Sequence, residues 1–360
     1  MKKRLLLSFA LVLLAAALVF AGVRKYRHRE GLRFVKQLGP GINLGNCLDA
    51  CGASKYMDAP TVEDYETFWH NPPISKTLLR GVKEAGFGLV RIPVTWEEHM
   101  DKAGKVDPLW MDRVEEVVRW ALDLGLTVIL DAHHEEWLDL SGDAEKAEAR
   151  FAYLWEQIAL RFADCGEELL FEGVNEPRLR DNELEWTGGD RKLRARVERL
   201  NRVFVDTVRA SGELNARRWL LLATYANGTE EEAMAALTLP DRRCIVSLHL
   251  YETYDFCQRE DGASQWEPEG KGAQELLAVC ESVRKRFTRR DVPVIFTECG
   301  CVDKDNEADR VLWTGTLREG AKLCSAPCVW WDNGSTYRLL DRETGKPVFP
   351  ALLRAFLKKS

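Results

Sequence analysis

Several motifs that would identify a fold at once are missing from this sequence. It has no Cys-x-x-Cys pair, no Gly-x-Gly-x-x-Gly run and no phosphate-binding Gly-x-x-x-x-Gly-Lys-Ser/Thr run, which argues against zinc ribbons and nucleotide-binding folds. Positive charge is not in excess, because 51 Lys and Arg face 57 Asp and Glu and give a net charge of −6. We therefore expect no nucleic-acid partner. No Pro/Ser/Gly-rich linker follows residue 33, so one domain is predicted.

The N-terminal segment, in contrast, has the pattern of an export signal. Lys2, Lys3 and Arg4 precede an uncharged apolar run over residues 5–23, and a basic linker follows at residues 24–32. Residues 1–23 are long enough for a cleaved signal peptide or for an N-terminal membrane anchor, and we favour cleavage. The protein is expected to be exported, as a secreted, periplasmic or cell-surface-anchored chain, with a membrane tether through residues 5–23 as the alternative.

The exported part contains an even number of cysteines, which fits disulfides in an oxidising compartment. Buried free thiols explain the same residues equally well, so both interpretations stay open. The ten cysteines are Cys47, Cys51, Cys165, Cys244, Cys257, Cys280, Cys299, Cys301, Cys324 and Cys328.

Short apolar runs rich in β-formers recur along the chain, separated by amphipathic stretches such as Leu109–Leu124 and Leu193–Ala210. Alternation of this kind predicts parallel strand pairing. Eight such units match a (β/α)8 TIM barrel, an α/β fold in a single domain over residues 33–360. The eight predicted strands are Gly41–Leu44, Gly88–Pro93, Thr127–Asp131, Leu169–Val174, Trp219–Ala223, Cys244–Leu248, Val292–Phe296 and Pro327–Trp331.

Polar and aromatic residues gather at the carboxyl ends of these strands, where a barrel of this kind builds its active site. Glu176 and Glu298 stand out because each directly follows an apolar run. Ion pairs that close loops would explain either one alone. Two carboxylates across a cleft are the equipment for glycoside hydrolysis, with one as proton donor and the other as nucleophile.

The sequence resembles glycoside hydrolase family 5 of clan A, and within it the endoglucanase-type subfamily 4. The resemblance spans most of the chain. It rests on Gly41-Ile-Asn-Leu-Gly-Asn46, Trp69-His-Asn-Pro72, Val90-Arg-Ile-Pro-Val-Thr-Trp96, Asp131-Ala-His-His134, Phe171-Glu-Gly-Val-Asn-Glu-Pro-Arg178, His249-Leu-Tyr251, Thr297-Glu-Cys-Gly300 and Val329-Trp-Trp-Asp-Asn-Gly334. Ile42 and Cys299 depart from the family pattern, and neither removes a reacting group.

The resemblance implies that Glu176 is the acid/base and Glu298 the nucleophile of a retaining mechanism, with the carboxyl groups about 5 Å apart. It also implies that Arg91 and Tyr251 support Glu298, and that Asn175 binds the sugar 2-hydroxyl. The expected substrate-binding residues are Asn43, Arg91, His133, His134, Trp137, Asn175, His249, Tyr251 and Trp331.

Adjacent aromatic residues leave several roles open. Neighbours on a strand face opposite ways, so we favour His133 over His134 for the site, and Trp331 over Trp330. Trp96 and Trp137 lie on loops, where they could stack on outlying sugars or serve only packing. A further set is expected in the core: Trp110, Trp120, Trp155 and Trp219.

The leading hypothesis is a retaining endo-β-1,4-glucanase, acting as a monomer on β-glucan polysaccharide without a cofactor or metal. Xyloglucan or mixed-linkage glucan are alternative substrates, and a β-mannanase is a weaker one. Two alternatives belong to other functional classes. One is a catalytically silent barrel that only binds glycan. The other is a metal-dependent hydrolase in which His133, His134 and His249, with a carboxylate, are the metal ligands.

Overall fold

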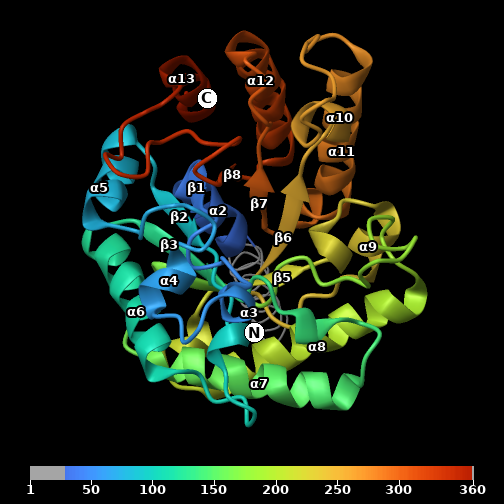
Figure 1. Cartoon of the computed structure of the whole chain (residues 1–360). Helices are drawn as coiled ribbons and strands as arrows, with labels where there is room; N and C mark the ends of the chain where they lie inside the picture. Colours follow the sequence, from blue (N-terminus) through green and yellow to red (C-terminus); the bar gives the residue numbers. More distant parts are fainter. Residues whose placement is uncertain (1–28, 359–360) are drawn as a thin grey trace, which may run out of the picture.

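The protein is built around eight parallel strands that pair in sequence order and close into a barrel, with β1 hydrogen-bonded to both β2 and β8 (Figure 1). The computed structural model describes residues 29–358. All eight predicted strands are confirmed, with ends that differ by at most three residues. They are β1 (Gly41–Leu44), β2 (Leu89–Ile92), β3 (Thr127–Asp131), β4 (Leu169–Glu172), β5 (Leu220–Ala223), β6 (Cys244–Leu250), β7 (Val294–Cys299) and β8 (Cys328–Asp332).

Helices connect the strands and cover the outside of the barrel (Figure 1). Four of the long ones begin at a side-chain cap: Ser75, Asp107, Asp143 and Asp190 each accept a hydrogen bond from a first-turn backbone N–H. The helices are α2 (Glu30–Leu38), α3 (Ala53–Tyr56), α4 (Val62–Glu66), α5 (Lys76–Ala85), α6 (Pro108–Asp123), α7 (Ala144–Arg161), α8 (Arg191–Ala210), α9 (Glu231–Ala236), α10 (Tyr254–Cys257), α11 (Lys271–Arg286), α12 (Glu307–Cys324) and α13 (Pro350–Leu357), with 3-10 turns η1 (Glu97–His99), η2 (Glu136–Leu138), η3 (Asn215–Arg217), η4 (Tyr225–Asn227) and η5 (Thr288–Arg290).

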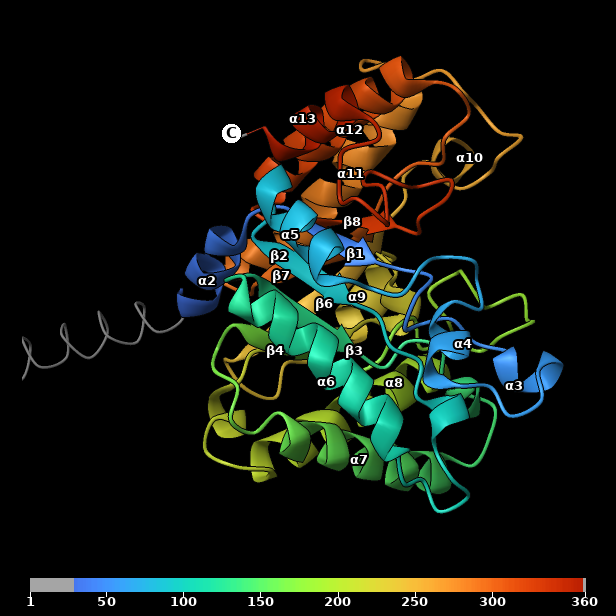
Figure 2. The ribbon, with the colours of Figure 1, turned by 60° about the vertical axis from the view of Figure 1, so that its left-hand side comes forward.

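Helix α2 closes the end of the barrel at which the strands begin. Its Val35 and Leu38 pack into the apolar core inside the barrel, together with strand residues such as Leu89 and Leu221. Figure 2 shows α2 at one end of the molecule and α3 and α4 at the other. Because α2 begins at Glu30, the domain starts inside the stretch 24–32 that the sequence predicted as linker.

The predicted export segment lies outside the described residues. Within residues 29–358, no helix is long and apolar enough to cross a membrane. All ten cysteines are free thiols in the structure, and all but Cys51 are buried. Of the two alternatives left open by the sequence, the structure therefore contains thiols rather than bridges.

Candidate active site

Glu176 and Glu298 face each other at the carboxyl ends of the strands. Glu298 lies on β7, beside a break in the register between β7 and β8. Glu176 follows β4 with a φ of +45°, and its backbone N–H donates to Asn227 Oδ1 at 2.7 Å. An oxygen of each carboxylate and a nitrogen of His249 all lie within 4.8 Å of one another. Carboxyl groups this close leave no room for a water between them and a sugar, which suits a retaining rather than an inverting glycosidase.

Arg91 on β2 anchors the nucleophile side of the site. Its Nη1 lies 2.9 Å from Glu298 Oε1, and its other nitrogens lie 2.6 Å from Glu172 Oε2 and 2.7 Å from Asp131 Oδ2. Burial lowers the pKa of Arg91, but the negative charges of Glu172, Asp131 and Glu298 raise it by more. The net pKa of Arg91 therefore lies above its ordinary value. The guanidinium stays charged and fixed in position.

Glu298 has a second donor in Tyr251, whose hydroxyl lies 2.9 Å from Oε2. Burial raises the pKa of Glu298 and the Glu176 carboxylate adds to this rise, whereas His249, Arg91 and the Tyr251 hydrogen bond oppose it. The net pKa lies above the ordinary value of 4.5. Glu298 is therefore a buried carboxylate whose ionised form depends on these donors.

Glu176 is paired with His249, whose Nδ1 lies 2.9 Å from Oε1, and Arg178 Nη1 lies 3.2 Å from Oε2. Burial raises the pKa of Glu176, but the His249 hydrogen bond and the charges of His249 and Arg178 outweigh it and bring the pKa to about 2. Burial lowers the pKa of His249, while Glu298 and Glu176 raise it to a net value above 6.5. These shifts favour the state in which His249, one hydrogen bond from Glu176, holds a proton at pH values below its raised pKa.

An aromatic wall stands beside the carboxylates. The rings of His133 and Trp331 are stacked with centroids 5.6 Å apart, and His133 Nδ1 lies 2.8 Å from Asp131 Oδ2. Trp330 is fully buried and so belongs to the core as predicted, whereas Trp331 is partly exposed and its sugar-binding role stays a prediction. His134 does not face away from His133, since their rings contact edge to face at 4.5 Å. Both histidines therefore belong to this wall, and the expected opposition between them is wrong.

Burial excludes direct sugar contact for two residues predicted to bind substrate and for Trp96, whose role the sequence left open. Asn43 and Arg91 are 0% exposed, so neither can touch a substrate. Asn43 instead accepts a hydrogen bond from Arg91 and donates to the carbonyl of Thr297. Trp96 is also 0% exposed and donates to the Asp131 carbonyl, so it serves packing.

The other predicted aromatic and amide residues vary in position. Trp137 is half-buried, with the Arg150 guanidinium 4.7 Å from its ring centre, so that face of the indole is occupied, and its sugar-binding role stays a prediction. Asn175 accepts from Arg91 and lines the cavity beside Glu176. The predicted core tryptophans are buried except for Trp120, which is only partly so.

Four residues of the site were not predicted: Asp131, Glu172, Arg178 and Asn227. Asp131 and Glu172 interrupt apolar strands, a signal that the sequence did carry. Asn227 begins an Asn-Gly-Thr glycosylation pattern, but it is fully buried and bonded to Ser247 and the Glu176 backbone, so it is no glycan acceptor. Arg178 lies in the loop between β4 and α8, where the sequence pattern gives no indication of its role.

Two sets of side chains come close enough to share a cation, namely Asp49 with His133 and His134, and Glu176 with His249 and Glu298. His249 and the His133–His134 pair thus belong to different sets among the described residues. The three-histidine metal site of the metal-dependent alternative is not assembled there.

Residues 53–336 match the family model for cellulase, glycosyl hydrolase family 5. The chain belongs to glycoside hydrolase family 5. It is 37% identical to Endoglucanase A of Ruminococcus albus over 88% of this chain and 89% of that one. It is likewise 37% identical to Endoglucanase B of the same organism over 90% and 79%.

Solved family 5 structures superimpose closely on this barrel. A GH5-4 broad specificity endoglucanase from Ruminococcus champanellensis with bound cellotriose has a TM-score of 0.87 and 35% identity, covering 91% of this chain and 98% of that one. A GH5 family lichenase from Caldicellulosiruptor sp. F32 has a TM-score of 0.86 and 31% identity, covering 91% and 95%. The predicted family, its hydrolase class and the (β/α)8 barrel are confirmed.

Proposed function

We propose that this family 5 hydrolase is a retaining endo-β-1,4-glucanase in which Glu298 is the nucleophile and Glu176 the acid/base. The single observation that carries the assignment is the approach of the two carboxylates and His249 to within 4.8 Å. The relatives named endoglucanase support the choice of glucan as substrate.

In the first step, an ionised oxygen of Glu298 attacks the anomeric carbon while Glu176 protonates the departing glycosidic oxygen. Arg91 and Tyr251 hold the attacking carboxylate in one orientation. The proton for the leaving group comes from the Glu176–His249 pair: transfer from Nδ1 to Oε1 turns an imidazolium and carboxylate into an imidazole and carboxylic acid without changing the net charge.

In the second step, Glu176 accepts a proton from water as that water attacks the anomeric carbon of the glycosyl-enzyme. The ester at Glu298 breaks, and the configuration of the sugar is retained. Once Glu298 is esterified, its negative charge no longer raises the pKa of His249, so the proton affinity of the pair falls and Glu176 is kept in the ionised form that a base needs. Trp331 and Asn175 are the proposed sugar contacts, as a stacking platform and as partner of the 2-hydroxyl.

The substrate is proposed to be an extended β-glucan, including mixed-linkage glucan, since one similar structure is a lichenase and another a broad specificity endoglucanase. We propose xyloglucan as an alternative substrate of the enzyme. Export through residues 1–23 and a monomeric state also remain proposals, supported by the apolar run and by a barrel core complete within one chain.

The test is product analysis on carboxymethyl-cellulose, barley β-glucan, xyloglucan and galactomannan, together with Glu176→Gln and Glu298→Gln. Internal cuts on a glucan that keep the anomeric configuration, and that both variants lose by about 1000-fold or more, are the expected result. Binding without cleavage of any polymer would favour the silent glycan-binding barrel. Loss of activity in EDTA would favour the metal-dependent alternative.

A further inference from the structure

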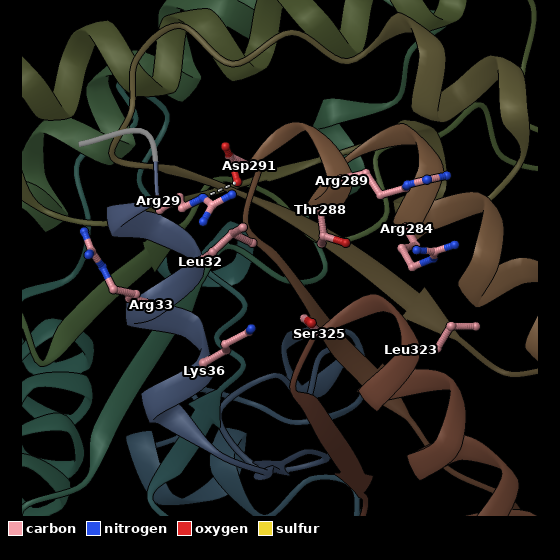
Figure 3. Close-up of a pocket in the computed structure, with 10 residues that line it drawn as sticks. All are labelled: Arg29, Leu32, Arg33, Lys36, Arg284, Thr288, Arg289, Asp291, Leu323 and Ser325. Atoms are coloured by element: carbon pink, nitrogen blue, oxygen red, sulfur yellow. Dashed lines mark ion pairs between the residues drawn. The ribbon is translucent and has the colours of Figure 1, made fainter. Parts of the chain in front are cut away.

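A basic face surrounds helix α2 at the end of the barrel opposite the active site. Two adjoining hollows of about 510 and 350 Å3 meet there at Lys36 and Ser325, between α2, η5 and the ends of α12 and α13. Figure 3 shows the first of them, with cationic side chains on both sides. We define the basic face by Arg29, Lys36, Arg284, Arg289, Lys322 and Lys358.

Most of this positive charge is uncompensated. One carboxylate, Asp291, lines the hollows, and it pairs with Arg29 at 3.3 Å, while Glu281 nearby pairs with Arg284. Among residues 29–358, no ion pair within 4 Å involves Lys36, Arg289, Lys322 or Lys358. These four cations lie on a part of the chain that is otherwise acidic, because residues 1–28 hold six Lys and Arg and no acid, which leaves −12 for residues 29–360.

Apolar side chains lie among the cations. Leu32 lines the first hollow between Arg29 and Lys36, and Leu323 beside Lys322 is 40% exposed. A surface that mixes Lys and Arg with exposed leucines has the composition of an interfacial membrane contact, in which cations meet phosphates and leucines enter the headgroup region.

The position of the basic face next to the N-terminal segment indicates which partner it would bind. Arg29 lies directly beside the hollow, and in the sequence only the five residues 24–28 separate it from the uncharged run 5–23. From these observations we infer that the basic face docks on the anionic phospholipid headgroups of a bilayer. This inference adds a surface of the catalytic domain itself to the membrane tether through residues 5–23, which is the alternative to cleavage of the export signal. In this orientation α2 lies against the membrane, and the carboxylates face away from it toward the polysaccharide.

The test uses the full chain with Leu13→Asp and Leu18→Asp, which interrupt the apolar run and remove insertion as a cause of binding. Sedimentation with vesicles of phosphatidylcholine alone, or of phosphatidylcholine and phosphatidylglycerol at 7:3, gives the bound fraction between 50 and 500 mM NaCl. We expect binding to the anionic vesicles only, weakening as salt rises.

Two triple variants in the same background locate the surface. Lys36→Glu, Arg289→Glu and Lys322→Glu together should weaken binding by about 100-fold. The matched control, Lys102→Glu, Arg191→Glu and Lys192→Glu, changes three exposed cations near the catalytic end and should leave binding within about 3-fold. Glucan hydrolysis should be unchanged in both.

Equal loss in both triple variants would overturn the inference, because net charge alone would then explain it. Equal binding to neutral vesicles would overturn it too. If soluble poly-γ-glutamate binds the protein and anionic vesicles do not, the face recognises a free polyanion instead. Failure of the tether has a separate signature, since the chain with an intact apolar run would then not bind neutral vesicles.

Discussion

The proton shared by Glu176 and His249 sets the pH range in which the proposed glucanase works. Glu298 must be ionised, and its raised pKa places the acid limb of kcat/KM above pH 4.5, with activity falling as the pH drops through that pKa. The pair must retain one proton, and the raised pKa of His249 places the alkaline limb above pH 6.5, with activity lost as the pH rises through it. Measuring kcat/KM from pH 3.5 to 9.5 checks both limbs.

His249→Gln provides the control for this profile. Removing the imidazolium removes a charge that lowers the pKa of Glu298, so the acid limb should move to higher pH. An acid limb that stays in place would contradict the electrostatic role assigned to His249.

Arg91 pairs with three buried carboxylates, and in the described chain no other Arg or Lys forms a salt bridge with any of them. Arg91→Met should lower the free energy of unfolding by about 3–5 kcal/mol, because Asp131, Glu172 and Glu298 would remain buried without it. Urea unfolding at pH 7 measures this. Arg217→Met, at an exposed position, should change the stability by no more than about 0.5 kcal/mol. Similar losses in both variants would contradict the predicted role.

The reacting residues could be predicted because each follows an apolar run, where the sequence offers no packing reason for a carboxylate. Two supporting residues could not. Asn227 arrives from the loop after β5, so its role depends on a contact between distant segments, and Arg178, two residues from Glu176, contacts it through the local turn after β4. Burial likewise decides that Asn43 holds Arg91 instead of a sugar and that Trp96 serves packing, and burial is a property of the folded chain.

At the level of elements, the loop after β5 holds the turn after β4 in place. Glu176 has a positive φ, and its N–H has Asn227 Oδ1 as its partner. Asn227→Ala should reduce kcat by about 10-fold with little change in KM, because the acid/base loses its orientation and not its sugar contacts. Steady-state kinetics on barley β-glucan measures both constants. Asn182→Ala, at an exposed position in the β4–α8 segment, should have normal kinetics.

Substitution of two helical glycines by alanine should change the free energy of unfolding in opposite directions. A Cβ on Gly81 in α5 would lie 2.4 Å from the Gly345 carbonyl oxygen, whereas a Cβ on Gly315 in α12 would meet nothing within 4 Å. Gly81→Ala should therefore destabilise the protein by about 1–3 kcal/mol through backbone displacement, and Gly315→Ala should stabilise it by up to about 1 kcal/mol through helix propensity. Urea unfolding compares the two, and stabilisation by both would show that α5 is free to move away from the 345 loop.

The order and type of elements were predictable because parallel strands buried on both faces give short apolar runs, and amphipathic helices separate them. The extension of β7 to Cys299 was not predictable, because the pairing of β7 with β8 is irregular between Phe296 and Cys299. The start of α2 was also missed. Its first residues, Glu30, Gly31 and Leu32, fall within the predicted basic linker. Only the folded structure, in which Val35 and Leu38 of the same helix pack into the barrel, shows them to be part of the domain.

For the whole molecule, burial of the thiols predicts slow chemical modification. Cys51 is the one cysteine that is not buried, so the native protein should react with about one equivalent of a thiol reagent at early times. In denaturant without reductant, all ten should react. Eight or fewer would show that a disulfide forms, and repeating the titration after reduction would then restore the count to ten.

Barrel closure pairs Gly41 of the first strand with Val329 of the last. A growing chain that stops before β8 leaves the edges of β1 and β7 unpaired, and such edges promote aggregation. Completion of the fold must therefore wait until almost the entire polypeptide has been made, however early the individual helices appear. Translational arrest or C-terminal truncation should consequently yield insoluble fragments instead of a partial enzyme. Only a chain synthesised through β8 should become active.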